Sequence, residues 1–294
     1  MRTGTWQRKL VAVAGRILMS EKIIVSFSGG RTSAYMGWWL KHHTEHELKF
    51  IYANTGSEHE DTLKFVDLCA KEWGIDIVWV EAAVNPEHGK GTRHKVVTYE
   101  TASRNGEPFE DVIRKYGISN QAYPHCTREL KLAPMQSYVK KHGWEGQWAI
   151  GIRSDEVDRI SAAYRENNLI YPLITMHPTT RDDISQWWTA NAFDLEVVEP
   201  YGNCVWCWKK SFRKLSTIAQ QNPQMFEFPA RMEAEYGLAG HNIDGNPRTF
   251  FRTRMTTQDV LALNHEQWSP STVTQPDMFW DETGGCSESC EVFS

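Results

Sequence analysis

The stretch that decides the fold is KIIVSFSGGRTS, residues 22–33. Its first half is a short, mostly apolar run that favours a β-strand, and Ser-Gly-Gly favours a tight turn. Thr32–Leu40 is dense in Tyr, Met, Trp and Leu, which indicates a helix. A strand that passes through glycines into a helix presents backbone N–H groups at an electropositive helix end, because glycine allows close approach to the backbone. The stretch therefore predicts a phosphate-binding loop, although two adjacent glycines alone equally favour a plain turn.

Strand and helix patterns alternate beyond this loop. Strands are predicted at 48–53, 75–80 and 147–152, and an amphipathic helix at 60–73. Such alternation implies right-handed crossovers and a mainly parallel sheet. We therefore predict an α/β fold with a parallel twisted sheet flanked by helices. The glycine turn then lies at the carboxyl edge of the sheet, where open α/β folds bind ligands.

A further helix is predicted at 180–190, because Thr180 and Asp183 fit a capping box and the apolar residues Ile184, Trp187 and Trp188 follow it.

The pattern divides the chain into four parts. The parts are an extension at 1–18 with translation expected from Met19, an α/β nucleotide-binding domain at 19–200 with an insertion at about 81–121, a helical segment at 201–282, and a cysteine-containing tail at 283–294.

Composition narrows the class of protein. Forty per cent apolar and 23% charged residues are ordinary globular values, and no run approaches the roughly 20 apolar residues of a membrane span. We expect a cytoplasmic protein, in which cysteine pairs favour metal or redox chemistry over structural disulfides. The formal charge of −5 argues against a surface that binds nucleic acid throughout. A basic and aromatic stretch at 248–254 either contacts a polynucleotide or forms a packed edge with exposed arginines.

Five segments together resemble a known family. They are SFSGGRTS at 26–33, FIYANTGSEHEDT at 50–62, IGIRSDEVDRIS at 150–161, YPLITMHPTTRDDI at 171–184 and YGNCVWC at 201–207. In this order they resemble the PP-loop superfamily, adenine nucleotide alpha hydrolase-like, and within it the phosphoadenosine phosphosulfate (PAPS) reductase family. The loop departs from many members, since Arg31-Thr32 stands where they have Lys-Asp.

The resemblance implies an adenine nucleotide ligand: PAPS, adenosine phosphosulfate or ATP, the last with magnesium. The residues it assigns to nucleotide binding are Ser26, Ser28, Gly29, Gly30, Arg31, Thr32, Ser33, Asn54, Thr55, Gly56, Gly151, Arg153 and Arg159. A planar guanidinium suits sulfate or phosphate because its donors engage two oxygens. The competing interpretation of Arg153 and Arg159 is a surface ion pair with a neighbouring carboxylate.

Three cysteines are candidate metal ligands: Cys126, Cys204 and Cys207. The CxxC pair at 204–207 can share one metal but does not complete a four-coordinate site. With Cys126 there are three thiolates, which suits a 4Fe-4S cluster with one open iron. Zinc bound with His125 and a redox dithiol are competing interpretations. Cluster-bearing relatives have a Cys-Cys pair where this chain has His125-Cys126.

The tail carries two further cysteines, Cys286 and Cys290. The family's reductases carry a nucleophilic cysteine in a Glu-Cys-Gly motif on the tail, and this tail resembles theirs in position only. The catalytic candidates that the resemblance implies are Cys290, Cys286, Lys131 and Arg153. The tail pair has two other interpretations, an adventitious disulfide and a fourth cluster ligand.

Three functions are consistent with these features. The resemblance implies first the reduction of adenylylated sulfate to sulfite, with a thioredoxin-like reductant as partner and a homodimer as a candidate assembly. The second is an ATP-dependent iron-sulfur sulfurtransferase that thiolates tRNA or DNA, and only this alternative involves nucleic acid. The third is a nucleotide-binding interaction protein without turnover, which the loss of the loop's Asp favours, because that carboxylate helps to hold magnesium.

Overall fold

The computed structural model describes residues 22–87, 89–241 and 245–264. Its centre is a six-stranded sheet with the order β4-β3-β2-β1-β5-β6. The strands are β1 (Lys22–Phe27), β2 (Glu47–Ala53), β3 (Ile77–Ala83), β4 (Arg93–Val97), β5 (Gln147–Ala149) and β6 (Leu169–Ile170). All neighbours are parallel except β3 and β4. The predicted α/β class and parallel sheet are confirmed.

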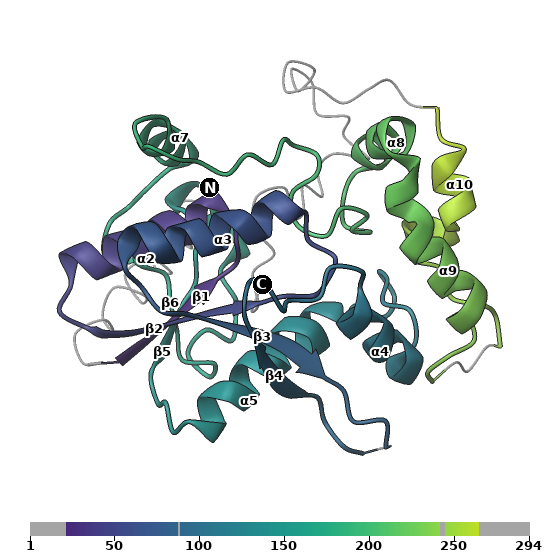
Figure 1. The fold of residues 1–294 in the computed structure, drawn as a ribbon, viewed down its shortest axis with the longest axis horizontal. Coiled ribbons are helices and arrows are strands. Elements are labelled where there is room, and N and C mark those ends of the chain that lie inside the picture. Colours follow the sequence, from purple (N-terminus) through teal and green to yellow (C-terminus); the bar gives the residue numbers. More distant parts are fainter. Residues whose placement is uncertain (1–21, 88, 242–244, 265–294) are drawn as a thin grey trace, which may run out of the picture.

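Helices cover both faces of the sheet (Figure 1). They are α2 (Arg31–His43), α3 (Glu60–Trp73), α4 (Glu107–Tyr116), α5 (Ala133–Lys141), α6 (Pro172–Thr175), α7 (Arg181–Thr189), α8 (Phe212–Gln221), α9 (Glu227–Tyr236) and α10 (Thr257–Leu261). A π-helical turn spans Thr127–Leu132, and 3-10 turns span Ser154–Arg159, Pro223–Phe226 and Arg252–Arg254. No helix in the described ranges is long and apolar enough to cross a bilayer.

Strand alternation explains how the two faces are filled. Successive side chains of a strand point to opposite faces, so Ile23 and Val25 pack with α2 and α3 while Ile24 packs with α5. Cys69, on the inner face of α3, is fully buried, and burial raises the pKa of its thiol. The thiol is therefore a neutral core group.

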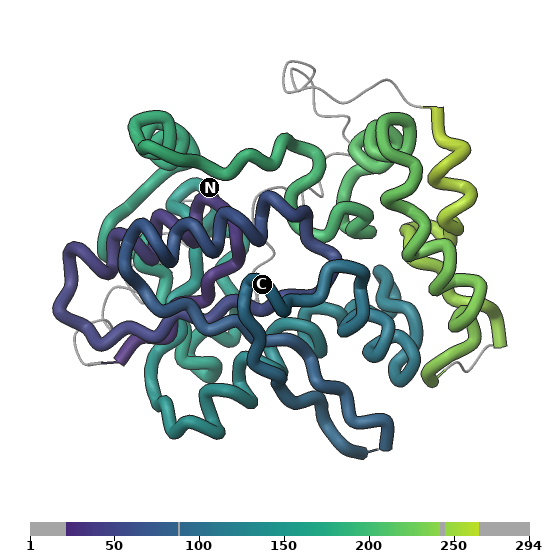
Figure 2. The backbone as a smooth tube through the Cα atoms, viewed as in Figure 1, coloured from purple at the N-terminus to yellow at the C-terminus, as the bar shows by residue number. Residues whose placement is uncertain are grey.

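A third apolar cluster joins α4 to α8, α9 and α10 around Trp206, Phe226 and Phe250. Figure 2 shows these C-terminal helices, green to yellow, beside α4. Because α4 belongs to the predicted insertion, the insertion and the C-terminal segment share one core. This core lies next to the segment that carries the CxxC.

Several predicted elements differ from the structure. The insertion at 81–121, in which no strand or helix was predicted, contains β4 and α4. Strand β4 is an edge strand whose sequence RHKVV is mostly exposed, so no apolar alternation marks it. Strand β5 ends at Ala149 and β6 is only two residues long. The prediction of a helix after Thr180 is confirmed as α7, with the capping box formed by Thr180 and Asp183.

Candidate functional site

The site lies at the point in the sheet where the order of the strands reverses. The chain proceeds from β1 to β2 on one side, whereas β5 lies on the other side of β1, so the loops after β1 and β5 diverge at the carboxyl edge. A pocket of about 890 Å³, including solvent at its mouth, opens there. It is lined by Ser28, Gly29, Gly30, Arg31, Glu58, Thr62, Lys131, Arg181, Ile184, Ser185, Leu195, Val197, Glu199, Gly202 and Asn203.

The glycine loop is braced by its own serines. The Ser33 hydroxyl donates to the Gly30 carbonyl oxygen at 3.1 Å and accepts from the Ser28 N–H at 3.0 Å, and it lies 2.8 Å from the Ser28 hydroxyl. Helix α2 starts without a side-chain cap, so the N–H groups of its first turn face the pocket. Ser33 thus shapes the loop, and the backbone supplies donors for an anion.

Glycine is required at two positions around the loop. Gly29 has φ +81°, and a Cβ there would lie 2.8 Å from Thr62 Cγ2. A Cβ at Gly151, after β5, would lie 3.0 Å from the Cα of Ser33. Close packing of the two loops therefore depends on both glycines.

The Arg31 side chain, which lines the pocket, is paired with residues of the pocket wall. Its Nε and Nη2 donate to the two carboxylate oxygens of Asp194 at 2.6 and 2.8 Å, and Nη2 also donates to the Leu195 carbonyl at 3.0 Å. Trp188 donates to the Arg31 carbonyl from α7. The Arg31 side chain therefore holds residues 194–195 against the loop, while its backbone stays in the loop.

The two predicted arginines after β5 are paired with carboxylates. Arg153 is 6% exposed, donates to Asp155 at 3.0 Å and reaches the Thr32 hydroxyl at 3.3 Å. Glu156 links it to Arg159, which contacts the same carboxylate. The ion pairs of the competing interpretation are present, but Arg153 is buried against the loop rather than exposed at the surface. Nucleotide binding by the two arginines stays a prediction.

The turn after β2 is held by the buried carboxylate of Glu81 and the half-buried carboxylate of Glu58. Asn54 is fully buried and donates to Glu81 at 2.8 Å, and Ser103 donates to the same carboxylate through its N–H and its hydroxyl. The Thr55 hydroxyl donates to Glu58 at 2.8 Å. These side chains of Asn54 and Thr55, assigned to nucleotide binding from the sequence, thus bond within the protein and position the turn.

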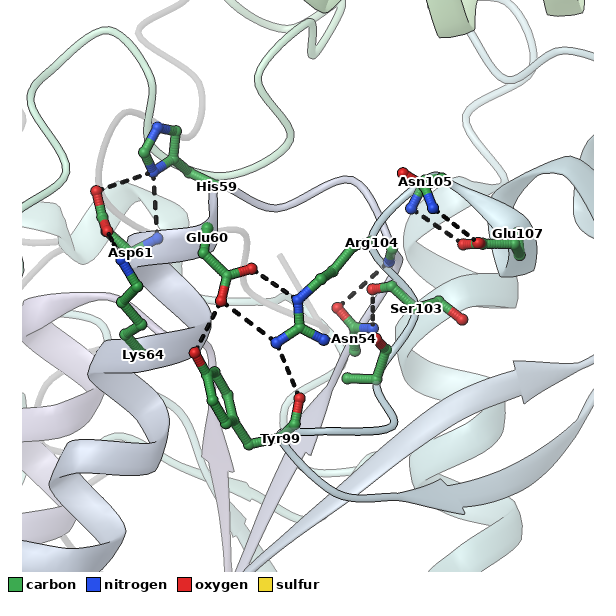
Figure 3. Close-up of polar contacts among 12 residues, drawn as sticks. Asn54, His59, Glu60, Asp61, Lys64, Tyr99, Ser103, Arg104, Asn105 and Glu107 are labelled. Carbon is green, nitrogen blue, oxygen red and sulfur yellow. Dashed lines mark hydrogen bonds and ion pairs between the residues drawn. The ribbon is translucent and has the colours of Figure 1, made fainter.

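A second network ties the insertion to the start of α3, as Figure 3 shows. Arg104 donates to Glu60 at 2.7 Å, and these hydrogen bonds lower the pKa of the Glu60 carboxyl. Tyr99 donates to Glu60 at 2.8 Å. The Gly106 N–H donates to the Gly56 carbonyl, so Gly56 anchors the insertion.

Lys131 is the predicted catalytic residue that the structure brings to the pocket. It belongs to the π-helical turn, is 7% exposed and lines the same pocket as the glycine loop. Arg181, Glu58 and Glu199 also line it and were not predicted. Arg181 stands in the segment YPLITMHPTTRDDI, but only the packing of α7 over the loop shows its position.

Two hydroxyls near the loop are buried without a hydrogen-bond partner among the described residues: Ser26 Oγ and Tyr52 Oη. Burial, then the negative charges of Glu58, Cys204 and Glu81, raise the pKa of Tyr52. Tyr52 therefore stays protonated beside the pocket floor.

The CxxC segment lies against the turn after β2. Glu58 and Cys204 form an antiparallel bridge, and Cys204 Sγ lies 3.6 Å from the Thr55 hydroxyl. Buried Lys210 donates through Nζ to the carbonyls of Gly202 and Cys204 at 2.6 and 3.0 Å. The segment is thus fixed beside the phosphate loop, and Gly202 lines the pocket.

The described cysteines do not form a metal-ligand group. Within the described ranges no cluster of three or more His, Cys, Asp and Glu side chains is placed to hold a metal ion. Cys126, Cys204 and Cys207 form no disulfide bond among the described residues, and the His125 Nε2 donates to the Gly117 carbonyl at 3.0 Å. The described side chains therefore do not complete a site for a cluster or zinc, and we derive no chemical step through either. Cys286 and Cys290 lie outside the described residues.

A glycine loop at the switch point of a parallel sheet, with a CxxC segment on the wall of the same pocket, defines an α/β protein of the PP-loop type. Residues 22–179, more than half of the chain, match the phosphoadenosine phosphosulfate reductase domain. The chain therefore belongs to the PAPS reductase domain family, within the adenine nucleotide alpha hydrolase-like superfamily, and this family implies nucleotide binding.

Proteins of two organisms are similar in sequence to this chain. The uncharacterized nin region protein ORF290 of Escherichia phage lambda is 32% identical over 284 residues, which cover 92% of this chain and 94% of that protein. The uncharacterized proteins MJ0973 and MJ0066 of Methanocaldococcus jannaschii are 28% and 23% identical over 120 and 124 residues. This chain covers 23% and 21% of their lengths.

Proposed function

We propose that the chain is an enzyme that binds an adenylylated sulfate in the loop pocket and reduces it to sulfite. The observation that carries this proposal is the composition of the pocket wall. The amide-rich loop, buried Lys131 and residues 202–203 border one space. Cys204 directly follows these residues in the chain, which supports a thiol acting on a group bound there.

The reaction begins with attack of a cysteine thiolate on the sulfonate sulfur. The bond between this sulfur and the bridging phosphate oxygen breaks, and the adenosine phosphate leaves with the electron pair. The N–H groups of the first turn of α2 and the ammonium of Lys131 stabilise the charge on the departing phosphate. The enzyme then carries a cysteine S-sulfonate.

A second thiol completes the reduction. It attacks the sulfur of the cysteine, sulfite leaves, and a disulfide forms. An external dithiol of the thioredoxin class reduces this disulfide. Cys286 and Cys290 remain the first candidates for the nucleophile by position in the family, and Cys204 is a further candidate because residues 202–203 line the pocket.

The test is product analysis under anaerobic conditions with a dithiol reductant. Purified protein is incubated separately with PAPS, adenosine phosphosulfate and ATP, and we expect sulfite from one of the first two. Lys131→Gln should reduce the rate strongly, whereas Lys140→Gln, an exposed lysine on α5, should not. Sulfite release that survives Cys286→Ser with Cys290→Ser but not Cys204→Ser assigns the nucleophile to the CxxC.

The second candidate is the ATP-dependent sulfurtransferase. It is supported by the carboxylates of Glu58 and Glu199 on the pocket wall, which suit a magnesium-bound triphosphate. Conversion of ATP to AMP and pyrophosphate only when tRNA or DNA is present would favour it over the reductase.

A further inference from the structure

A second groove, distinct from the loop pocket, lies between the residues before Cys126 and the segment that leads to α10. Its volume is about 870 Å³, including open solvent. Its lining residues are Asn120, Gln121, Ala122, Tyr123, Asn246, Pro247, Arg248, Thr249, Phe251, Arg252, Thr253 and Arg254. Three are arginines, and no Asp or Glu is among these described lining residues. In a chain with a formal charge of −5, this groove is locally cationic.

Buried aromatic residues hold the arginines in place. Phe250 and Phe251 are 0% and 2% exposed and pack in the C-terminal core, so they are anchors rather than a binding surface. The guanidinium of Arg248 donates to the carbonyls of Tyr116 and His241, both neutral acceptors. Within the described residues, the Arg248 guanidinium is therefore held by carbonyl groups and not by a carboxylate.

An aromatic ring is exposed beside these cations. The Arg248 guanidinium carbon lies 3.8 Å from the centre of the Tyr123 ring, and Tyr123 is 39% exposed. Thr253 and Arg254 have φ values of +57° and +61°, which are uncommon for residues other than glycine. This left-handed turn leaves Arg254 exposed at the groove while Arg252 donates inward to the Lys210 carbonyl at 2.7 Å.

We propose that this groove binds the phosphate backbone of a single-stranded nucleic acid, with a base stacked on Tyr123. The exposed Arg254, in a groove whose described lining has no Asp or Glu, provides a phosphate contact, and an aromatic ring backed by a guanidinium provides a stacking surface for any base. The groove has room for more than one phosphate, and the exposed amides of Gln121 and Asn246 can reach base edges. A free phosphate would not use the ring, and an acidic peptide would not require it.

The groove is also connected to the CxxC segment. Arg252 donates to the carbonyl of Lys210, whose Nζ donates to the carbonyls of Gly202 and Cys204. A strand bound in the groove would therefore be linked through Arg252 and Lys210 to the backbone beside Cys204. This binding does not depend on the proposed reduction of adenylylated sulfate, and the two can fail separately.

The experiment measures fluorescence anisotropy of labelled single-stranded DNA and RNA of about 12 nucleotides with the full chain. Titrations run from about 50 to 200 mM salt, because phosphate contacts make affinity salt-dependent. We expect Arg254→Gln to weaken binding. The slope of the logarithm of the binding constant against the logarithm of the salt concentration should become less steep by about 0.7, the value for one lost phosphate contact on a single strand. Arg254→Lys should retain the salt dependence.

Tyr123→Leu should weaken binding about fivefold or more at every salt concentration, since stacking is not ionic. The matched control is Arg165→Gln, an exposed arginine placed over Tyr164 away from the groove, which should bind as the wild type does. Circular dichroism of each variant checks the fold.

Three results would overturn the proposal. One is the absence of oligonucleotide binding at the lowest salt, and another is an equal effect of Arg254→Gln and Arg165→Gln. The third is a pair of findings: polyglutamate at equal charge displaces the oligonucleotide, and the Tyr123→Leu variant binds the oligonucleotide as well as the wild type does. Together they would make the groove a general anion-binding surface.

Discussion

Replacing Gly29 by alanine is the most direct test of the phosphate loop. Gly29 has φ +81°, and the added Cβ would lie 2.8 Å from Thr62 Cγ2 and 3.2 Å from Tyr52 Cε2. Thr62 and Tyr52 are 4% and 1% exposed, so neither side chain can move into solvent. The substitution therefore combines left-handed backbone strain with overpacking.

The magnitude follows from these two contributions. A left-handed conformation costs an L-residue roughly 1–2 kcal/mol, and overpacking of a buried site typically costs about 1–3 kcal/mol. We expect Gly29→Ala to lower the free energy of unfolding by about 2–5 kcal/mol. Gly74, the C-cap of α3, is the matched control because it has φ +56° and no atom within 4 Å of its added Cβ. Gly74→Ala should therefore cost only the backbone contribution, about 1–2 kcal/mol.

Urea unfolding followed by tryptophan fluorescence gives both free energies, and calorimetric titration with PAPS or ATP gives the affinities. Gly29→Ala should also lose nucleotide affinity, because displacement of the loop misdirects the N–H groups at the start of α2. Gly74→Ala should bind normally. Equal destabilisation by the two substitutions would refute the close packing of the loop against Thr62 and Tyr52.

Three further predictions concern the surroundings of the pocket. Asp194→Asn removes the two-point contact with exposed Arg31, so the free energy of unfolding should fall by less than about 1 kcal/mol. The nucleotide affinity measured by calorimetry should fall by more than this in free energy. Equal losses of unfolding free energy and binding free energy would contradict a positioning role. Lys210→Met removes the buried ammonium that donates to the Gly202 and Cys204 carbonyls. It should destabilise the fold by about 1–3 kcal/mol and speed the reaction of Cys204 with a disulfide reagent, so an unchanged reaction rate would count against it. Burial lowers the pKa of His125 below the ordinary 6.5, so the unfolded chain binds the proton more readily and stability is lost as pH falls from 6.5 toward the folded pKa. His125→Gln should flatten the decline of unfolding free energy between about pH 7 and 5, and an unaltered pH profile in urea unfolding would show that His125 does not contribute.

Local patterns predicted the central elements well. Strand β1 and helix α3 have the bounds expected from their apolar run and their three- and four-residue spacing. Strands β4 and β6 were missed because an exposed edge strand and a two-residue strand carry no periodic signal.

Partners of charged side chains could not be predicted from the sequence. Arg31 contacts Asp194, 163 residues further along the chain, and no local pattern indicates this pair. Lys131 matched a family motif, but its position in the pocket results from the π-helical turn that follows Cys126. The arrangement of the cysteines stays a prediction, since it depends in part on residues beyond Asn264.

The paired arginines change how anion recognition at the loop is understood. Arg31 is held by Asp194 and Arg153 by Asp155, so an incoming phosphate would have to compete with a carboxylate for either cation. Competition of this kind reduces the net gain from a charged contact, whereas the N–H groups at the start of α2 gain a partner without losing one. The backbone of the loop should therefore supply most of the phosphate affinity. On this argument the loop can carry Arg31-Thr32 in place of Lys-Asp, because the side chains of Arg31 and Thr32 contact Asp194 and Arg153.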